Sequence, residues 1–471
     1  MSKPSIPQGT RDFSPEEVRK RQYIFNTLRA IFEVYGFQPL ETPSMENLTT
    51  LTGKYGEEGD RLIFKILNNG LHEKKDADKE KLNAEWDKVL SKPYSSPVVT
   101  ERALRYDLTI PFARYVVMHQ NDLAFPFRRY QMQPVWRADR PQKGRYREFW
   151  QCDVDMVGST SLINEAELLC IYQEAFHRLK VPVTIKINSR KILVGLAEVC
   201  GIPDKFVDLT VALDKLDKIG WPGVSEELLN RNIATPAVIN TIINFINILT
   251  DKQTSNIDFF RELKVFFINN VIGSQGVSEL EVTWDYFQKL STNSNIESKV
   301  VFDIRLARGL NYYTGIIVEV VCNDSNVKMG SIGGGGRYDD LTGLFGLKGL
   351  SGVGVSFGID RIYDVMEELK VFPQQLAEGT KAMLVNFGGE NETYALHILQ
   401  QLRAVGIAAE IYPDAAKFDK QMKYANKRGI AYVLLPGDEE RQKNMVSLKN
   451  FTTGEQKMLS IGACIAALEK V

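Results

Sequence analysis

Long apolar runs, paired cysteines and paired histidines are all missing from this sequence. No window holds eighteen consecutive apolar residues, close to the length that a membrane-spanning helix requires. The five cysteines are scattered without a Cys-x-x-Cys pair, which argues against a zinc site or a disulfide framework. None of the four histidines is spaced as a metal-ligand pair, so no His-based metal site is expected. The first residues carry no apolar targeting core, which predicts a cytoplasmic protein without a membrane partner.

Charge of one sign and phosphate-binding loops are missing as well. The formal net charge is −1, so a nucleic-acid partner would have to be met by local basic patches. No GxxxxGK[ST] pattern is present, which excludes a P-loop. The stretch GVGVSFGIDR (352–361) superficially resembles a dinucleotide turn. Its residues Val353, Val355 and Phe357 alternate with small ones, which predicts one strand with an apolar face and a bare face.

The periodicity along the chain predicts three parts, in keeping with its 471 residues. Helical spacing follows an N-cap at Ser14 and predicts an amphipathic helix over 15–35. Residues 190–299 are almost entirely helical in pattern, between two strand-rich regions. The last ninety residues alternate strands and helices, which predicts a small α/β domain with a partly parallel sheet. The charged segment 72–92 predicts a solvated helix or insertion without chemistry.

Two polar regions could form a site. Residues 128–151 are dense in arginine, which fits a polyphosphate or a nucleic-acid end but equally a solvated hairpin. In RYDLTIPFAR (105–114), strand spacing would place Asp107 and Thr109 on one face. Three further polar residues on the strand after the arginine loop share a face that lines a cleft or meets solvent: Gln151, Asp153 and Asp155.

The stretch ARGLNYYTG (307–315) puts Arg308 and two tyrosines before a β-branched strand at 316–322. A charge there needs an anion or a carboxylate, because burial without a partner is costly. Both an ion-paired strand end and a binding site satisfy this requirement. A second glycine-rich stretch, SIGGGGRYDDL (331–341), precedes the one at 352–361 and also ends near an arginine, Arg337.

Taken together and in order, these stretches resemble class II aminoacyl-tRNA synthetases, and within them the histidyl-tRNA synthetase family. The stretch ETPSME (41–46) is similar to the first class motif, whose proline, here Pro43, lies at a dimer interface. Residues 135–155 resemble the second motif and residues 352–362 the third. The stretches LARGLNYYTG and GGGGRYDDL resemble the two that are particular to the histidine enzymes.

The resemblance implies an α+β fold with a class II core, an antiparallel sheet flanked by helices. It places the catalytic domain at 1–189 and 300–372, a helical insertion domain at 190–299 and an anticodon-binding α/β domain at 380–471. It also implies a homodimer. The reaction implied is that of a histidine–tRNA ligase, in which L-histidine and ATP give histidyl-adenylate, and tRNA(His) then takes the acyl group. Magnesium would accompany ATP as part of the substrate, with no tightly bound cofactor.

The same resemblance assigns residue roles. Arg308 and Arg137 would hold the α-phosphate and contact histidine, and Arg361 would hold the far phosphates of a bent ATP. The bare strand face at Gly354 and Gly358 would accept the adenine. Histidine would meet a set that binds its amino group (Asp107, Thr109, Gln151) and a set that reads its imidazole (Asp155, Tyr312, Tyr313).

Contact with tRNA is implied at two places. The acceptor end would meet Arg140 and Gln142 in the arginine loop, and the basic helix near 417–429 would bind RNA through Lys420, Lys423 and Lys427. Two positions depart from the family pattern, since Asn311 stands where Asp is frequent and Asp360 where Glu is commoner. The alternative is a non-catalytic relative that binds histidine or tRNA and regulates a partner. Such relatives typically lose a signature arginine or the last domain, and this chain has both.

Overall fold

A computed structural model describes residues 3–91, 96–250, 256–291, 299–307, 312–373, 376 and 379–469. The chain divides into two units, one of residues 1–12 and 24–371 and one of residues 13–23 and 372–471. No helix in the described ranges combines the length and apolar character that a membrane crossing demands.

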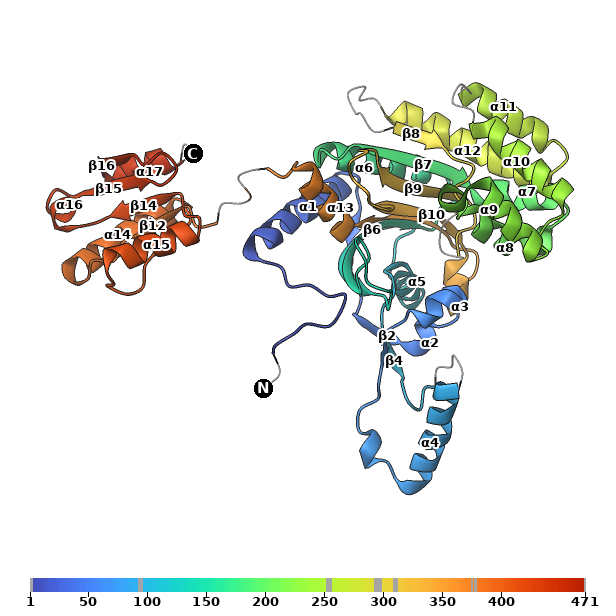
Figure 1. Ribbon diagram of the computed structural model, residues 1–471, viewed down its shortest axis with the longest axis horizontal. Helices are drawn as coiled ribbons and strands as arrows, with labels where there is room; N and C mark the ends of the chain where they lie inside the picture. The colour runs from blue at the N-terminus through green and yellow to red at the C-terminus, as the bar shows by residue number, and fades with distance from the viewer. Residues whose placement is uncertain are drawn as a thin grey trace. The chain divides into compact units, whose positions relative to one another are not determined.

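An eight-stranded sheet organises the first unit, in the order β1-β5-β6-β11-β10-β9-β7-β8 (Figure 1). The six central strands pair antiparallel, and only the edge pairs β1–β5 and β7–β8 are parallel. This arrangement agrees with the antiparallel core expected from the sequence. The strands are β1 (Gln38–Pro39), β5 (Phe127–Trp136), β6 (Glu148–Val157), β7 (Val183–Ser189), β8 (Lys299–Phe302), β9 (Ile316–Cys322), β10 (Gly333–Asp339) and β11 (Ser351–Gly358).

One face of this sheet is apolar and lies under helices. Phe357 of β11 packs against Phe32 with ring centroids 5.7 Å apart and against Tyr172 at 4.6 Å. Val353 and Val355 share that face and are buried, because residues two apart in a strand point the same way. The alternation predicted for this strand is confirmed. The covering helices are α1 (Pro15–Val34), α6 (Ile163–Arg178) and α13 (Ile359–Leu369).

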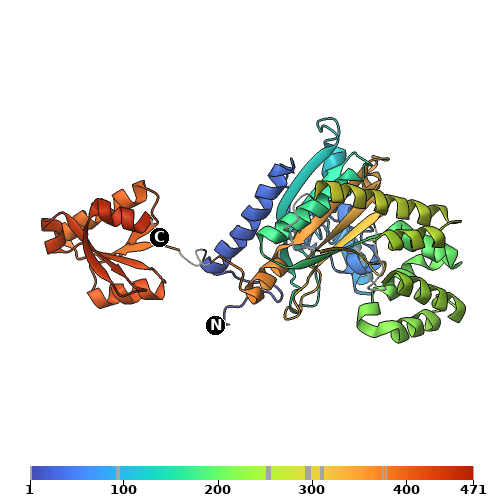
Figure 2. The same ribbon diagram turned by 90° about the horizontal axis from the view of Figure 1, so that it is seen from above.

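The region expected to be helical forms a run of helices, of which α12 contacts strands β7 and β9 (Figures 1 and 2). Helices α7 and α12 approach closely, since a Cβ on Gly195 would lie 2.6 Å from the Cα of Gly273. Ser189 caps α7 by accepting a hydrogen bond from the Lys191 N–H. The helices are α7 (Arg190–Val199), α8 (Phe206–Leu213), α9 (Leu216–Asn230), α10 (Pro236–Thr250), α11 (Asn256–Phe266) and α12 (Val271–Leu290), with a 3₁₀ turn η2 (Pro203–Lys205).

A three-stranded sheet, ordered β2-β4-β3, and several short helices complete the first unit. The charged segment at 72–92 contains helix α4, whose side chains are mostly exposed, as the sequence predicts. These elements are β2 (Met45–Asn47), β3 (Lys65–Ile66), β4 (Arg102–Leu104), α2 (Leu48–Leu51), α3 (Gly56–Arg61), α4 (Asp76–Ser91), α5 (Thr109–Met118), η1 (Leu71–Glu73) and η3 (Leu341–Phe345).

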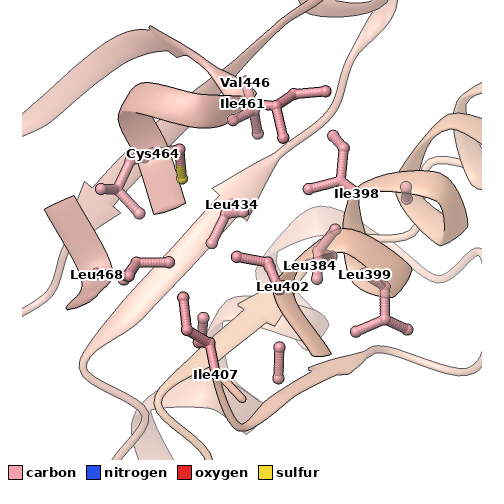
Figure 3. Packing of buried hydrophobic residues seen from close by; sticks show 14 residues of the cluster. Leu384, Ile398, Leu399, Leu402, Ile407, Leu434, Val446, Ile461, Cys464 and Leu468 are labelled. Carbon is pink, nitrogen blue, oxygen red and sulfur yellow. The ribbon is translucent and has the colours of Figure 1, made fainter. Parts of the chain in front are cut away.

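The second unit contains a five-stranded sheet in the order β13-β12-β14-β15-β16. β12 is parallel to both of its neighbours and the other pairs are antiparallel, so the predicted partly parallel α/β sheet is confirmed. Leu384, Leu402 and Leu434 are fully buried in its core (Figure 3). The elements are β12 (Ala382–Leu384), β13 (Ala409–Ile411), β14 (Tyr432–Leu435), β15 (Met445–Asn450), β16 (Gln456–Ser460), α14 (Gly389–Ala404), α15 (Phe418–Lys427), α16 (Asp438–Gln442) and α17 (Ile461–Glu469).

Candidate active site

A cavity of about 240 Å³ opens in the first unit, over the sheet face opposite the apolar one. Residues 333–334, 356 and 358 form its floor, where small side chains leave the strands bare. Three arginines, Arg137, Arg145 and Arg361, line its wall together with Tyr146 and Tyr313. Of the residues that the resemblance assigns a role, five line this cavity: Arg137, Gln151, Tyr313, Gly358 and Arg361.

Arg361 is fixed by two backbone carbonyls. Its Nε donates to the Gly144 oxygen at 2.6 Å and its Nη1 to the Ser331 oxygen at 2.6 Å. Burial lowers the pKa of Arg361, and the positive charges of Arg145 and Arg137 lower it further. Such a concentration of cations in a partly buried wall favours the binding of an anion.

Arg137 follows strand β5 and is held by an aromatic pair. Its Nε donates to the Tyr106 carbonyl at 3.0 Å, and its guanidinium lies 4.3 Å from the centre of the Tyr106 ring and 5.2 Å from that of Phe149. Stacking of this kind orients a guanidinium without neutralising it. The remaining donors of Arg137 can therefore serve a phosphate or carboxylate in the cavity.

Asp107 lies fully buried next to the cavity wall. Its carboxylate accepts hydrogen bonds from the Tyr55 hydroxyl at 2.9 Å, the Tyr312 hydroxyl at 3.2 Å and the Ile110 N–H at 3.1 Å. Burial raises the pKa of Asp107 despite these donors. The expected strand placement is wrong, because Thr109 begins helix α5 and Asp107 lies in the turn before it. Both side chains are nevertheless buried.

Asp155 is the second buried carboxylate of the site. It forms an ion pair with Arg129 at 2.9 Å and accepts a hydrogen bond from the Tyr338 hydroxyl at 2.6 Å. Burial raises its pKa, with the Arg129 charge opposing the shift. Gly354 lies directly opposite Asp155 across the β11–β6 pair. The bare position at Gly354 is therefore filled by a carboxylate, while Gly358 borders the open cavity.

The two adjacent tyrosines connect the buried carboxylates to the cavity. The rings of Tyr312 and Tyr313 are 5.0 Å apart and nearly edge to face. Burial raises the pKa of Tyr313, and the charges of Asp153 and Asp155 raise it further. A neutral phenol that faces both a cavity and two carboxylates is suited to hydrogen-bonding a polar ligand ring. Arg308 and Asn311, which precede these tyrosines, lie outside the described residues.

Several arginines singled out in the sequence support the fold. Arg337 is buried and binds Glu165 through two hydrogen bonds of 2.5 and 2.7 Å, so the second glycine stretch does not end at the cavity. Arg128 pairs with Glu167, and Arg129 with Asp155. The arginine-rich region is therefore divided between structural ion pairs and the cavity wall. Alternation along β5 sends Arg128 and Arg129 to opposite faces, so they pair with carboxylates on opposite sides of the sheet.

The loop between β5 and β6 presents its polar residues to solvent. Arg140 and Gln142 are exposed, and Gln142 forms an isolated bridge with Arg145. Asp360, just after the bare strand, is buried and accepts hydrogen bonds from Arg11 and from the Trp150 N–H. The loop is thus accessible to a large ligand. Asp360 ties the N-terminal segment at Arg11 to strand β6 at Trp150.

Sequence reasoning assigned no role to several residues that complete the site. Ser356 accepts a hydrogen bond from Gln151 Nε2 at 2.8 Å, and Asp153 lies opposite Ser356 in the strand register. Tyr55 and Tyr338, from separate parts of the chain, each donate to a site carboxylate. The alternation in β6 and β11 could have identified Ser356 from the sequence. Tyr55 and Tyr338 could not be identified in this way, because only the folded chain brings them to the site carboxylates.

The basic helix of the second unit forms a separate surface. Lys420, Lys423 and Lys427 are exposed on α15. Phe418 begins this helix and lies parallel to Phe387, with an interplanar angle of 6° and both rings about two-fifths exposed. Exposed aromatic rings beside lysines are typical of surfaces that bind single-stranded nucleic acid.

An antiparallel sheet with a bare strand, cationic walls and buried carboxylates at one cavity is the core of a class II aminoacyl-tRNA synthetase. The family model described as histidyl-tRNA synthetase matches residues 99–362, and that of an anticodon binding domain matches residues 381–471. The chain belongs to the histidyl-tRNA synthetase family, a family of ligases.

Individual relatives agree over the full length. The histidine–tRNA ligase of Christiangramia forsetii is 53% identical over 471 residues, 99% of either chain. That of Phocaeicola vulgatus is 50% identical over 468 residues, again 99% of each chain. The crystal structure of histidyl-tRNA synthetase from Nostoc sp. PCC 7120 superimposes with a TM-score of 0.79 at 29% identity and covers 100% of both chains. These relatives support the ligase and not the regulatory alternative.

Proposed function

We propose that this chain activates L-histidine with ATP and transfers the histidyl group to the 3′ end of tRNA(His). The observation that carries the proposal is one cavity with two kinds of wall. Arg137 and Arg361 supply positive charge to it, and Tyr313 connects it to the buried carboxylates Asp107 and Asp155. A phosphate chain fits the first wall and a cationic amino acid fits the second.

In the first step the histidine carboxylate oxygen attacks the α-phosphorus of ATP. The bond to the bridging oxygen breaks, and pyrophosphate leaves with its electron pair. Arg137 and Arg308 stabilise the added charge on the α-phosphate, and Arg361 holds the far phosphates. Preorganisation matters because fixed guanidiniums need not reorganise as charge develops, and Arg361 is already fixed by two carbonyls. Mg²⁺ enters with ATP, held mainly by phosphate oxygens.

Histidine lies with its amino group near Asp107, Thr109 and Gln151. Its imidazole donates to Asp155 and meets Tyr313, with Tyr312 as a pocket wall. A pocket that hydrogen-bonds both ends of the substrate discriminates strongly, because an analogue leaves buried polar groups unpaired. Asp155 and Asp107 are both buried, and the tyrosine hydroxyls that donate to them hold each carboxylate in place for the substrate.

Transfer to tRNA uses both units. The exposed loop with Arg140 and Gln142 meets the acceptor end. The exposed lysines of α15 meet the RNA backbone, and Phe387 and Phe418 offer a stacking surface for a base. Residues 1–189 with 300–372 form the catalytic domain, 190–299 an insertion domain and 380–471 the anticodon-binding domain. The protein acts in the cytoplasm as a homodimer, with the segment around Pro43 at the interface.

Histidine-dependent exchange of labelled pyrophosphate into ATP tests the activation step. We expect exchange with the wild type and a loss on the order of 10²–10³ in rate for Arg308→Ala, the typical effect of removing one preorganised donor. The Arg308→Ala variant should keep the wild-type melting temperature. Normal exchange by this variant would contradict the role of Arg308, and no exchange by the wild type would contradict the proposed function.

A further inference from the structure

The side-chain amide of Gln151 is held in one orientation by a serine on the neighbouring strand. Gln151 Nε2 donates to Ser356 Oγ at 2.8 Å, diagonally across the β6–β11 pair. The Ser356 hydroxyl also hydrogen-bonds to the carboxylate of Asp153, its direct partner in the register. All three side chains share the site face of the sheet, and Gln151 and Ser356 both line the cavity.

The proton count of the serine hydroxyl fixes the direction of this chain of hydrogen bonds. A hydroxyl has one proton, and the Asp153 carboxylate, whose pKa burial raises to about 7, is ionised at pH 8 and can then only accept. Ser356 therefore donates its proton to Asp153 and accepts from Gln151, which must turn its nitrogen toward the serine. The carbonyl oxygen then points elsewhere. Gln151 Oε1 is buried and has no donor among the described residues, so it is an unused acceptor at the cavity wall.

The backbone of Ser356 is fixed independently of its hydroxyl. Its carbonyl oxygen accepts a hydrogen bond from Tyr172 at 2.8 Å on the apolar side of the sheet. On its other flank the register partner is Gly334, which has no side chain. The hydroxyl of Ser356 thus meets Asp153 and Gln151, and its removal leaves the packing of β11 in place.

We propose that Ser356 is a positioning residue for histidine, which acts by presenting Gln151 Oε1 as an acceptor to the α-ammonium group of the substrate. Because the Ser356 hydroxyl donates its proton to Asp153, its oxygen can only accept from Gln151. Without the serine, the amide can rotate and present its NH₂ group, which repels an ammonium ion. This inference rests on the proposed function, because it assumes that histidine occupies the cavity with its amino group toward Gln151.

Calorimetric titration of the full chain at pH 8, where Asp153 is ionised, tests the inference without catalysis and uses two ligands. The ligands are L-histidine and 3-(imidazol-4-yl)propanoate, which lacks only the α-amino group. We expect Ser356→Ala to raise the Kd for histidine about tenfold and to change the Kd for the analogue by less than about twofold. Ser356→Thr, which keeps the hydroxyl, should restore most of the histidine affinity. A parallel loss for both ligands, or no loss for histidine, would overturn the inference.

A double-mutant cycle with Gln151→Ala separates positioning from general support. If Ser356 acts through Gln151, adding Ser356→Ala to Gln151→Ala should not weaken histidine binding further. Additive losses would overturn the inference. Pyrophosphate exchange by the wild type tests the proposed function separately. Histidine binding with no exchange would contradict catalysis and leave the serine effect measurable.

Discussion

Gly354 and Asp155 lie opposite each other in strands β11 and β6, and a Cβ on Gly354 would lie 1.9 Å from Asp155 Oδ1. Glycine at this position therefore makes room for a buried carboxylate. The same carboxylate oxygen accepts the 2.6 Å hydrogen bond from Tyr338. Any side chain at position 354 must displace the group that is proposed to read the imidazole.

Gly354→Ala should therefore impair histidine use more than ATP use. We expect the KM for histidine in pyrophosphate exchange to rise at least about tenfold, equivalent to about 1.4 kcal/mol. Gly358→Ala is the matched control, because its Cβ would meet the Ile332 oxygen at an ordinary 3.4 Å and enter the cavity wall. That variant should raise the KM for ATP instead. A higher KM for ATP in Gly354→Ala and a higher KM for histidine in Gly358→Ala would exchange the assignments of the two glycines.

Asp155→Asn should weaken the recognition of histidine and also lower stability. The amide removes the charge that the buried Arg129 pairs with, and breaking such a pair typically costs about 3–5 kcal/mol. We expect the KM for histidine to rise at least about tenfold and the KM for ATP to change less than about twofold. Glu165→Gln breaks the buried pair with Arg337, which lies away from the cavity. This variant should lower the melting temperature without raising the KM for histidine relative to that for ATP. A parallel rise in both KM values would make Asp155 a structural residue.

Much of this carboxylate face could be predicted from the sequence. The alternation of β6 places Gln151, Asp153 and Asp155 on one face, as expected from a period of two. The partner of Asp155 could not be predicted, because Arg129 reaches it only through the register of β5 against β6. The stretch 128–151 contains seven basic residues, and nothing in the sequence distinguishes the one that pairs with Asp155.

The segment around Asp107 shows a second limit. A spacing of two between Asp107 and Thr109 fits a strand, but it also fits the turn that enters a helix. Asp107 accepts from the Ile110 N–H, which is such an entry. The donors Tyr55 and Tyr312 come from positions 52 residues before and 205 after Asp107, so only the folded chain brings them together.

Asp153 should make stability depend on pH. Burial raises the pKa of Asp153 from 3.8 to about 7, with Asp155 adding to the shift and Arg129 opposing it. Between these values the folded chain keeps a proton that the unfolded chain has released, so stability falls as the pH rises. Asparagine does not titrate. We therefore expect the melting temperature of Asp153→Asn, relative to wild type, to rise by about 2 °C or more between pH 5 and pH 8.

The exposed Asp414→Asn serves as the control for this experiment. The change of melting temperature with pH in Asp153→Asn is compared with that in this variant. A difference for Asp153→Asn that stays constant, or that falls with rising pH, would show that the Asp153 carboxylate is ionised at little cost in the folded chain.

Phe418→Ala should affect tRNA and leave adenylate formation unchanged. Stacking of one base on an aromatic side chain is typically worth about 1–3 kcal/mol. We expect the KM for tRNA(His) to rise about fivefold or more, while pyrophosphate exchange stays at the wild-type rate. Val405→Ala removes a similarly exposed apolar side chain from the same unit and should change neither value. An unchanged KM for tRNA in Phe418→Ala would exclude the aromatic pair as a base-binding surface.

Charging of purified tRNA(His) with labelled histidine tests the central claim most directly. The full-length chain, with ATP and Mg²⁺, should transfer histidine to the 3′ end, and omission of ATP should abolish the acid-precipitable label. None of the other amino acids should be charged at a comparable rate, because they would leave unpaired the buried carboxylates and hydroxyls that are proposed to bind the imidazole. Binding of tRNA and histidine without transfer, or equal charging with several amino acids, would contradict the account.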